Sequence, residues 1–160
     1  MFKKLLSALG LFIAILIAKG IGGQVGREVG QAAVSPSKPT PFEVETALIE
    51  GFTRAAKQYN QRLPMMLDQD TRLDKASVEP GPRAVYHHTF PRYSSREIDA
   101  NLLRTNLRPD IMLQVCASEE MKTSLQYGGI YVYAYSGNDG IEITRFEIDR
   151  NDCGYPETLP

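Results

Sequence analysis

Ile130-Tyr131-Val132-Tyr133-Ala134-Tyr135 alternates aliphatic side chains with tyrosines along its whole length. Successive side chains of a β-strand point to opposite faces, so the tyrosines share one face of a predicted strand and the aliphatic residues share the other. Ser136-Gly137-Asn138-Asp139-Gly140 follows as a turn, because its Asp-Gly pair suits positive φ. The chain then returns as a partner strand over Ile141–Ile148, which completes a predicted β-hairpin.

A second hairpin is predicted upstream of the first. Met65 to Val78 carries apolar residues on alternate positions between polar ones, a pattern typical of an edge strand. Glu79-Pro80-Gly81-Pro82 has the composition of a turn. Arg83 to Phe90 alternates again and predicts the second strand of this pair.

A helix is predicted before this second hairpin. Thr40 lies in the N-cap position, Pro41 in the first helical position, and Glu43 completes a Thr-x-x-Glu capping box. Pro64 ends the predicted helix, because the residue before a proline avoids the α conformation. The apolar residues of one face recur at spacings of three and four: Val44, Leu48, Phe52, Ala55, Tyr59 and Leu63.

The segment between the two hairpins is predicted to be helical. Ser94 and Glu97 form another capping box, and apolar residues follow at helical spacing. Pro109 is expected to interrupt this helix, and a second helical piece is expected from Asp110. Ser118 caps a third, short helical piece.

The order of elements is therefore helix, hairpin, helices, hairpin. Strands joined in tight pairs indicate an antiparallel sheet, and the helices are expected to cover one of its faces. The predicted fold class is α+β. A transmembrane or signal helix is predicted to precede this domain, within residues 1–31.

The N-terminus has the order of residues found in secretory targeting segments. Lys3 and Lys4 precede an apolar run from Leu5 to Ala18. The run itself is short for a membrane-spanning helix, which needs about 20 residues, but weakly apolar residues extend it. Two outcomes stay open: a retained signal-anchor helix within residues 1–31, or cleavage near Ala18-Lys19-Gly20.

The domain organisation follows from this segment. Residues 1–31 are the predicted anchor, residues 32–39 have the small, polar composition of a linker, and residues 40–160 form the predicted globular domain. Positive charges stay on the cytoplasmic side, so a single-pass inner-membrane protein with a periplasmic domain is expected. Signal cleavage would instead release the domain into the periplasm.

Small residues recur every four positions through the predicted anchor. On a helix, residues at this spacing lie near one face, as in the packing stripes of membrane helices. The pattern predicts self-association of the anchor or packing on another membrane helix. The residues are Ala14, Ala18, Gly22, Gly26 and Gly30.

Composition limits the functions that the chain can have. The net charge is −1, with no basic cluster along the sequence, so a nucleic-acid partner is not expected. Cys116 and Cys153 are the two cysteines, and an even number in an exported domain indicates one disulfide. The alternative is a pair of free, buried thiols.

Residues that could carry chemistry are few. His87 and His88 are adjacent, so on a strand they point to opposite faces and do not share one metal ion. Asp68, Asp70 and Asp74 lack the glycine and glutamate of a calcium loop, and a charged strand edge is the expected reading. No metal site and no cofactor motif is predicted.

The tyrosine row, which we define as Tyr131, Tyr133 and Tyr135, is the most suggestive feature of the predicted sheet. Helices that cover this face would bury the three rings. Alternatively, an exposed row would bind a protein partner, because tyrosine is enriched at the centre of protein interfaces.

One combination of residues resembles a known pattern. The pattern resembles that of small, membrane-anchored periplasmic proteins of bacteria. Its residues are Leu63-Pro64, Asp70-Thr71-Arg72-Leu73, Tyr86, Cys116, Tyr133 and Cys153. The resemblance covers Phe42 to Cys153. It implies a periplasm-facing location in a Gram-negative envelope, and it implies no activity.

The function expected from the sequence is binding without catalysis. A membrane-anchored accessory protein would serve an envelope machine as a subunit or act as a protective inhibitor of a toxin. A periplasmic domain that binds a small molecule is the first alternative. A hydrolase that uses His88 and Cys116 is the second and less favoured alternative, since a cysteine in an oxidising compartment is usually structural.

Overall fold

The computed structural model describes residues 39–156, so the predicted anchor and its small-residue stripe lie outside the described residues. No helix within this range has the length and apolar character needed to cross a membrane. The elements, in chain order, are α3 (Pro41–Asn60), β1 (Met65–Met66), β2 (Arg72–Glu79), β3 (Arg83–Phe90), a 3-10 helix η2 (Ser95–Glu97), α4 (Ala100–Ala117), α5 (Glu119–Gln126), β4 (Ile130–Gly137) and β5 (Glu142–Ile148).

The sheet has five strands in the order β1-β2-β3-β4-β5, and the two predicted hairpins are present as β2–β3 and β4–β5. The single edge strand predicted over Met65–Val78 is wrong in its bounds: the chain turns back after Met66, so β1 pairs with β2 and β1 is the edge strand. The expectation of a wholly antiparallel sheet is wrong at the centre, because β3 and β4 pair in parallel, with Tyr86 opposite Tyr133. The chain between these strands forms η2, α4 and α5. This helical crossover returns the chain to the end of the sheet at which β3 begins, so β3 and β4 run in the same direction. The fold is α+β with a mixed sheet.

The start of α3 forms as its capping box predicts. The Thr40 side chain accepts a hydrogen bond from the Glu43 backbone N–H, and a Glu43 carboxylate oxygen accepts the Thr40 backbone N–H at 2.7 Å. Asn60 ends the helix and bridges to the sheet, since its side-chain amide donates to the Ala76 carbonyl and accepts the Ala76 N–H. Both ends of α3 are therefore fixed by side chains.

Two predictions about the second helical region are corrected. The Ser94–Glu97 capping box forms, but it starts only the 3-10 helix η2, and Asp99 is the N-cap of the long helix α4. Pro109 does not interrupt α4, which runs unbroken from Ala100 to Ala117. Pro109 is exposed, so the backbone carbonyl four residues earlier, which loses its hydrogen bond to the missing N–H, faces water. Burial of the apolar residues on the opposite side of α4 stabilises the helix.

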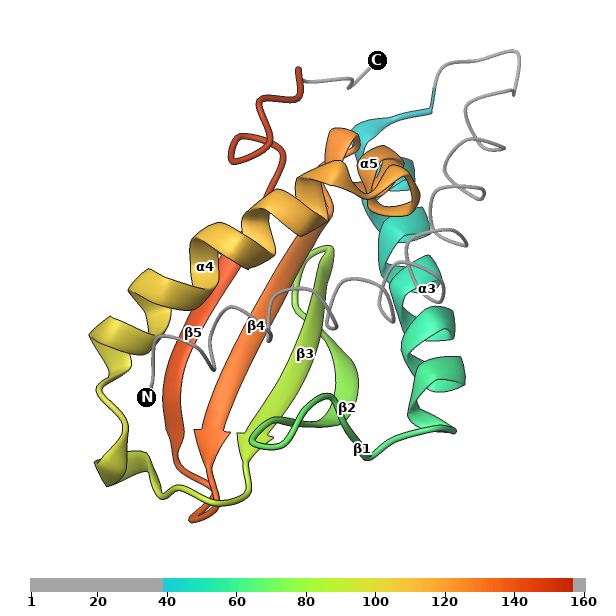
Figure 1. The fold of residues 1–160 in the computed structure, drawn as a ribbon. Helices are drawn as coiled ribbons and strands as arrows, with labels where there is room; N and C mark the ends of the chain where they lie inside the picture. The colour runs from blue at the N-terminus through green and yellow to red at the C-terminus, as the bar shows by residue number, and fades with distance from the viewer. Residues whose placement is uncertain (1–38, 157–160) are drawn as a thin grey trace.

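The helices lie on one face of the sheet, as predicted (Figure 1). Helix α3 packs over β2 and β3, while α4 packs over β5, and α5 lies at the end where α3 begins. Figure 1 shows that α3 and α4 approach each other near α5 and diverge toward the opposite end of the sheet. The central strands β3 and β4 therefore lie between the two helices.

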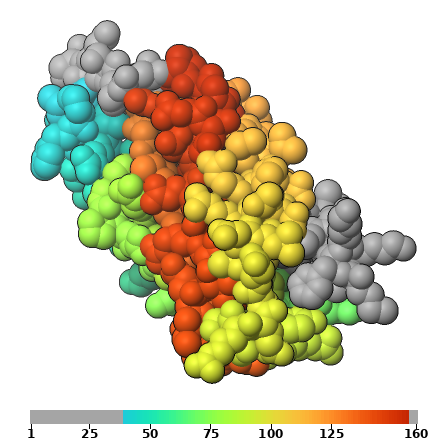
Figure 2. Space-filling model, turned by 90° about the vertical axis from the view of Figure 1, so that its left-hand side faces the viewer, coloured from blue at the N-terminus to red at the C-terminus, as the bar shows by residue number. Residues whose placement is uncertain are grey.

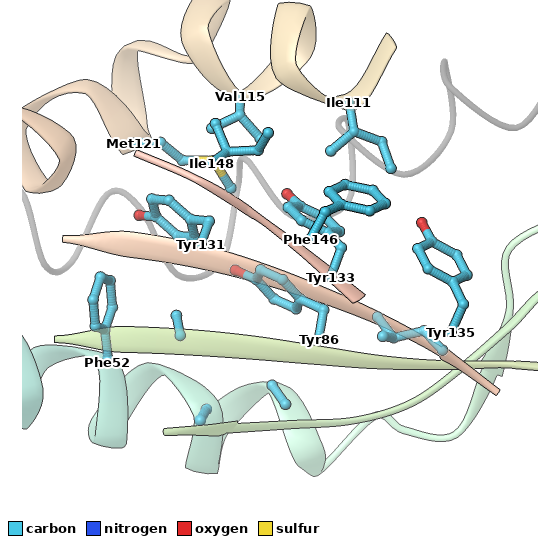
Figure 3. Packing of buried hydrophobic residues seen from close by; sticks show 14 of the residues in the cluster. Phe52, Tyr86, Ile111, Val115, Met121, Tyr131, Tyr133, Tyr135, Phe146 and Ile148 are labelled. Carbon is cyan, nitrogen blue, oxygen red and sulfur yellow. The ribbon is translucent and has the colours of Figure 1, made fainter. Parts of the chain in front are cut away.

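The core fills the space between this sheet face and the helices. Apolar residues at every fourth position of α4 point inward, and one face of α3 does the same. They meet the aromatic side chains of β3, β4 and β5 (Figure 3). The largest side chains with less than 2% exposure are Tyr86, Tyr131, Tyr133, Tyr135, Phe52, Leu48, Leu73, Leu107 and Leu125.

On the opposite face of the sheet, side chains of the strands pack against one another. A small apolar cluster of Val85, Val132 and Ala134 is buried there. Ion pairs of long side chains share this face. Arg145 of β5 bonds Glu79 of β2 and Glu142 of its own strand, and Arg83 of β3 bonds Glu147 of β5 across the intervening strand β4.

The disulfide predicted between Cys116 and Cys153 is present, with the two Cα atoms 5.2 Å apart. It joins the last turn of α4 to the segment that follows β5. The Tyr155 hydroxyl donates to the Cys116 carbonyl at 2.5 Å, so the same segment is attached to α4 twice. The alternative of two free thiols is excluded.

Candidate functional site

The tyrosine row lies on the helix-facing side of β4, and its three rings are at most 1% exposed (Figure 3). Phe146 of β5 flanks Tyr133 and Tyr135, with ring centroids 5.8 and 6.0 Å from theirs. Tyr86 of β3 stands on the other side, 5.4 Å from the Tyr133 ring. The sequence left two interpretations of the tyrosine row open, buried under helices or exposed to a partner, and in the structure the row is buried. The row forms no exposed surface in this structure.

Tyr131 is the member of the row with a satisfied hydroxyl group. Ser124 of α5 donates to the Met121 carbonyl at 2.7 Å, so its oxygen is left to accept the hydrogen bond of the Tyr131 hydroxyl, also at 2.7 Å. The Phe52 ring meets the Tyr131 ring edge-on at 5.5 Å. Burial raises the pKa of Tyr131, so this group stays a neutral donor.

Other polar atoms in this region are buried without a hydrogen-bond partner. They are the hydroxyl oxygens of Tyr59, Tyr86 and Tyr135, the Thr71 hydroxyl oxygen and Nε2 of His88. A buried polar atom that lacks a partner lowers stability by about 1–3 kcal/mol, so native structures contain few of them. Three of these atoms belong to the central strands β3 and β4: the hydroxyl oxygens of Tyr86 and Tyr135 and Nε2 of His88. Carboxylate oxygens of Asp68 and Glu120, outside these strands, are also buried without a partner.

The two histidines lie on opposite faces of β3, as their adjacency predicts. His88 is 1% exposed on the helix side, and its Nδ1 donates to the Ala134 carbonyl at 3.3 Å. Burial lowers the pKa of His88 to about 4, so the ring is neutral at pH 7. His87 lies half-buried on the other face, where its Nε2 bonds the Ser77 hydroxyl at 2.7 Å.

No reactive set is assembled from the candidate residues. Cys116 is in the disulfide, so it supplies no thiol to His88, and the hydrolase alternative loses its nucleophile. No cluster of three His, Cys, Asp or Glu residues able to hold a metal occurs within residues 39–156. Asp68 accepts the backbone N–H groups of Asp70 and Thr71, which makes it a turn residue.

A cavity of about 550 Å³ lies beside β5, and the sequence did not predict it. Its walls come from α4, from the outer edge of β5 and from the loop that follows β5. Arg108 of α4 bonds Asp152 of this loop at 2.5 Å and reaches the Glu147 carbonyl at 3.4 Å. The cavity is lined mainly by charged side chains, and none of the tyrosine row lines it.

Sequence comparisons find no relative: no family model matches the chain, and no curated protein matches it. Three solved structures are similar to it. A candidate secreted protein (PA3611) of Pseudomonas aeruginosa has 19% identity and a TM-score of 0.58, over 69% of this chain and 96% of that one.

The other two are pilotins of type II secretion systems. EpsS of Vibrio vulnificus has 14% identity and a TM-score of 0.57, over 70% of this chain and 96% of its own. AspS of Vibrio cholerae has 12% identity and a TM-score of 0.53, over 70% of this chain and 97% of its own. The described domain shares their fold. Each of these proteins is matched over almost its whole length.

Proposed function

We propose that the chain is a non-catalytic accessory protein of the bacterial envelope and that it acts by binding a protein partner. The observation that carries this proposal is the shared fold with two type II secretion pilotins and a candidate secreted protein. The disulfide supports it, because disulfides persist in the oxidising periplasm and are rare in the cytoplasm. The oxidised state of Cys116 argues against a thiol-dependent enzyme.

The proposed binding surface is the region of β3 and β4 between α3 and α4. The two helices pack on different strands and diverge away from α5, so they can separate without breaking the sheet (Figure 1). The unpaired hydroxyl groups of Tyr86 and Tyr135 and Nε2 of His88 lie under this region. A partner segment that enters between the helices would supply the missing hydrogen bonds, which favours binding.

The tyrosine row would then contribute to binding in an indirect way. Tyr133 and Tyr135 are buried in the unbound domain and would meet the partner only after α3 or α4 has moved. The energy of this movement is offset by satisfied hydroxyl groups and by the apolar area that the partner covers. This is a conformational change at the site, in contrast to the open tyrosine surface that the sequence offered as the alternative to burial.

The location belongs to the same proposal. Lys3, Lys4 and the apolar run that follows would hold the protein in the inner membrane, with the domain in the periplasm. The small-residue stripe from Ala14 to Gly30 would pack on another membrane helix or on a second copy. If the segment is cleaved, the domain would act as a periplasmic protein and the stripe would have no role.

Capture of the partner from envelope membranes tests the function. The full chain, purified under oxidising conditions, is expected to retain the same protein in repeated isolations. The double variant Tyr86→Phe/Tyr135→Phe keeps every ring but removes two hydroxyl groups, and it is expected to retain at least fivefold less partner. Tyr127→Phe is the matched control, since Tyr127 is not among the buried side chains with an unpaired hydroxyl.

Two results contradict the proposal. Equal retention by the double variant and by wild type would remove the surface between α3 and α4 from the binding site. Failure of the full chain to retain any envelope protein, under conditions in which its disulfide is intact, would overturn the accessory role itself.

A further inference from the structure

The outer edge of β5 carries backbone groups with no partner in the sheet. Within residues 39–156, β5 is the last strand in the sheet order and pairs only with β4. The Glu147 carbonyl is within reach of Arg108 from outside the sheet, so the Glu147 backbone faces outward. Outward and inward groups alternate along an antiparallel strand, so the N–H and C=O of Arg145 face outward as well.

The cavity beside this edge has the position that an added strand would take. It lies along Arg145, Phe146 and Glu147, with α4 beside it and residues 149–152 where the chain leaves the strand. Figure 2 views the molecule from this side and shows the orange-red atoms of β5 at the surface, beside yellow α4 and below the red C-terminal segment. An exposed strand edge of this kind is a template for pairing with another extended chain.

All but one of the charged side chains that line the cavity have a partner among the described residues. Asp149 is in no ion pair, but its carboxylate accepts the backbone N–H groups of Asn151 and Asp152. Arg108 bonds Asp152, Arg145 bonds Glu79 and Glu142, and Glu147 bonds Arg83. Arg104, on the α4 wall of the cavity, makes no hydrogen bond or ion pair with any described residue, and its side chain is exposed. One positive charge is thus available to a ligand on this side of the edge.

We propose that the β5 edge binds an extended, acidic segment of a partner protein, which adds a sixth strand to the sheet. The Arg145 backbone N–H and C=O pair with the backbone of this segment, and Arg104 pairs with one of its carboxylates. This surface lies at the outer edge of the sheet, away from the central strands proposed above as the first binding site. The inference therefore goes beyond the proposed function and does not depend on it.

An acidic segment fits this edge better than a second copy of the chain. Two copies paired antiparallel about Arg145 would place the two Arg145 side chains opposite each other, and like charges in that position are destabilising. Shifting the register by one residue pair would place Arg145 opposite Glu147, but both side chains already have partners on their own sheet. Arg104 would stay unpaired in either arrangement unless a carboxylate reached it.

The experiment uses the full, oxidised chain in detergent and a fluorescein-labelled peptide, Thr-Val-Glu-Val-Thr-Val, read by fluorescence anisotropy. The same peptide with Lys in place of Glu tests the charge, and the Glu peptide with an N-methylated central backbone tests strand pairing. Wild type is expected to bind the Glu peptide at least tenfold more tightly than either altered peptide.

Variants of the chain separate the two contacts. Arg104→Glu is expected to reverse the preference between the Glu and Lys peptides, while Arg96→Glu, an exposed arginine outside the cavity, leaves it unchanged. Arg145→Pro removes the outward N–H and is expected to abolish binding. Arg145→Ala keeps this N–H and loses only the ion pairs, so it is expected to retain binding within threefold of wild type.

Other outcomes overturn the proposal. Equal affinity for the Glu and Lys peptides, or an Arg104→Glu variant that still prefers Glu, removes the acidic ligand. Unchanged binding of the N-methylated peptide removes strand addition. A doubling of the protein mass in sedimentation that Arg145→Pro abolishes and Arg145→Ala preserves would instead assign the edge to a second copy. Partner capture through the central strands is measured separately, so the two proposals fail independently.

Discussion

The imidazole ring of His88 stacks on the phenol ring of Tyr135, with the ring centroids 4.6 Å apart and the planes inclined by 14°. The two side chains come from adjacent strands that run in parallel, and they face each other in register. Both are fully buried, and each has a polar atom without a partner, Nε2 of His88 and the hydroxyl oxygen of Tyr135. Protonation of this imidazole therefore places a charge in the core.

The first prediction concerns pH. Because burial lowers the pKa of His88 from 6.5 to about 4, the unfolded chain binds a proton between these two values and the folded chain does not. The free energy of unfolding is expected to decrease as pH falls through this window, by up to about 3 kcal/mol. Urea denaturation of the oxidised protein at pH 7, 5.5 and 4.5 measures this decrease.

His88→Phe is the variant that checks the assignment. It keeps an aromatic ring in the stack and removes the titrating nitrogen, so most of the decrease between pH 6.5 and 4.5 is expected to disappear. His87→Gln is the comparison variant. The pKa of half-buried His87 is also lowered, chiefly by burial, so this variant is expected to remove a smaller part of the decrease than His88→Phe does. A His88→Phe variant with the same pH dependence as wild type would contradict the prediction.

The second prediction compares two tyrosines of the row. Tyr131→Phe removes a buried hydrogen bond to Ser124 and is expected to lower the free energy of unfolding by about 1 kcal/mol. Tyr135→Phe removes a buried hydroxyl that has no partner, and it is expected to be neutral or to stabilise by up to about 1 kcal/mol. Chemical denaturation at pH 7 measures both. Equal destabilisation by the two changes would show that the Tyr135 hydroxyl is bonded in solution.

The third prediction concerns the disulfide. Cys116 and Cys153 close a loop with a sequence separation of 37. In the chain-entropy model, loss of a link of this length lowers the free energy of unfolding by about 4 kcal/mol. The double variant Cys116→Ala/Cys153→Ala is expected to show this loss in thermal and urea denaturation, and reduced wild type is expected to match it. Insensitivity of wild type to reductant would argue that the link contributes little.

The fourth prediction concerns the start of α3. Thr40→Ala removes the side-chain cap of the first turn and is expected to cost about 1 kcal/mol of stability. Thr46→Ala is the matched control, because the Thr46 hydroxyl donates to the Phe42 carbonyl within the same helix and caps nothing. The control is expected to change stability by less than about 0.5 kcal/mol. A larger effect at Thr46 than at Thr40 would contradict this account.

Local signals predicted most of the elements correctly. The Thr40 capping box, the alternation around Tyr133 and the Asp139-Gly140 turn each act within a few residues, and each has the structure that its pattern indicates. Gly140 has the positive φ of 75° that the turn requires. Pattern reasoning works here because the forces that shape these segments are local.

The parallel pairing of β3 and β4 was not predictable from such signals. Each strand alternates in the same way whether its neighbour runs parallel or antiparallel, so the pattern of Tyr86 or Tyr133 carries no information on direction. The direction depends on the crossover through α4 and α5, and Pro109 suggested that this crossover was broken into shorter pieces. Burial of α4 outweighed the cost of the proline.

The cavity beside β5 was missed for a related reason. Its walls come from α4, β5 and the following loop, which lie far apart in the sequence. One signal was available: a disulfide from Cys116 to Cys153 necessarily brings Asp152 close to α4, where Arg104 and Arg108 lie one turn apart. Combining the predicted disulfide with helical spacing would have placed these charges together.

The parallel ladder between β3 and β4 divides the described domain into two halves, one with α3 and β1–β3 and one with α4, α5, β4 and β5. Only the second half contains a disulfide. The turns of both hairpins and the disulfide each lie within one half, so no short connection spans the boundary. Across it run the backbone ladder and ring contacts such as Phe52 with Tyr131. The ion pairs of Arg145 with Glu79 and of Arg83 with Glu147 also cross it, so a force that pulls the two halves apart acts on non-covalent contacts alone until the crossover is extended. The half that contains α4, α5, β4 and β5 would stay tied together by its crosslink.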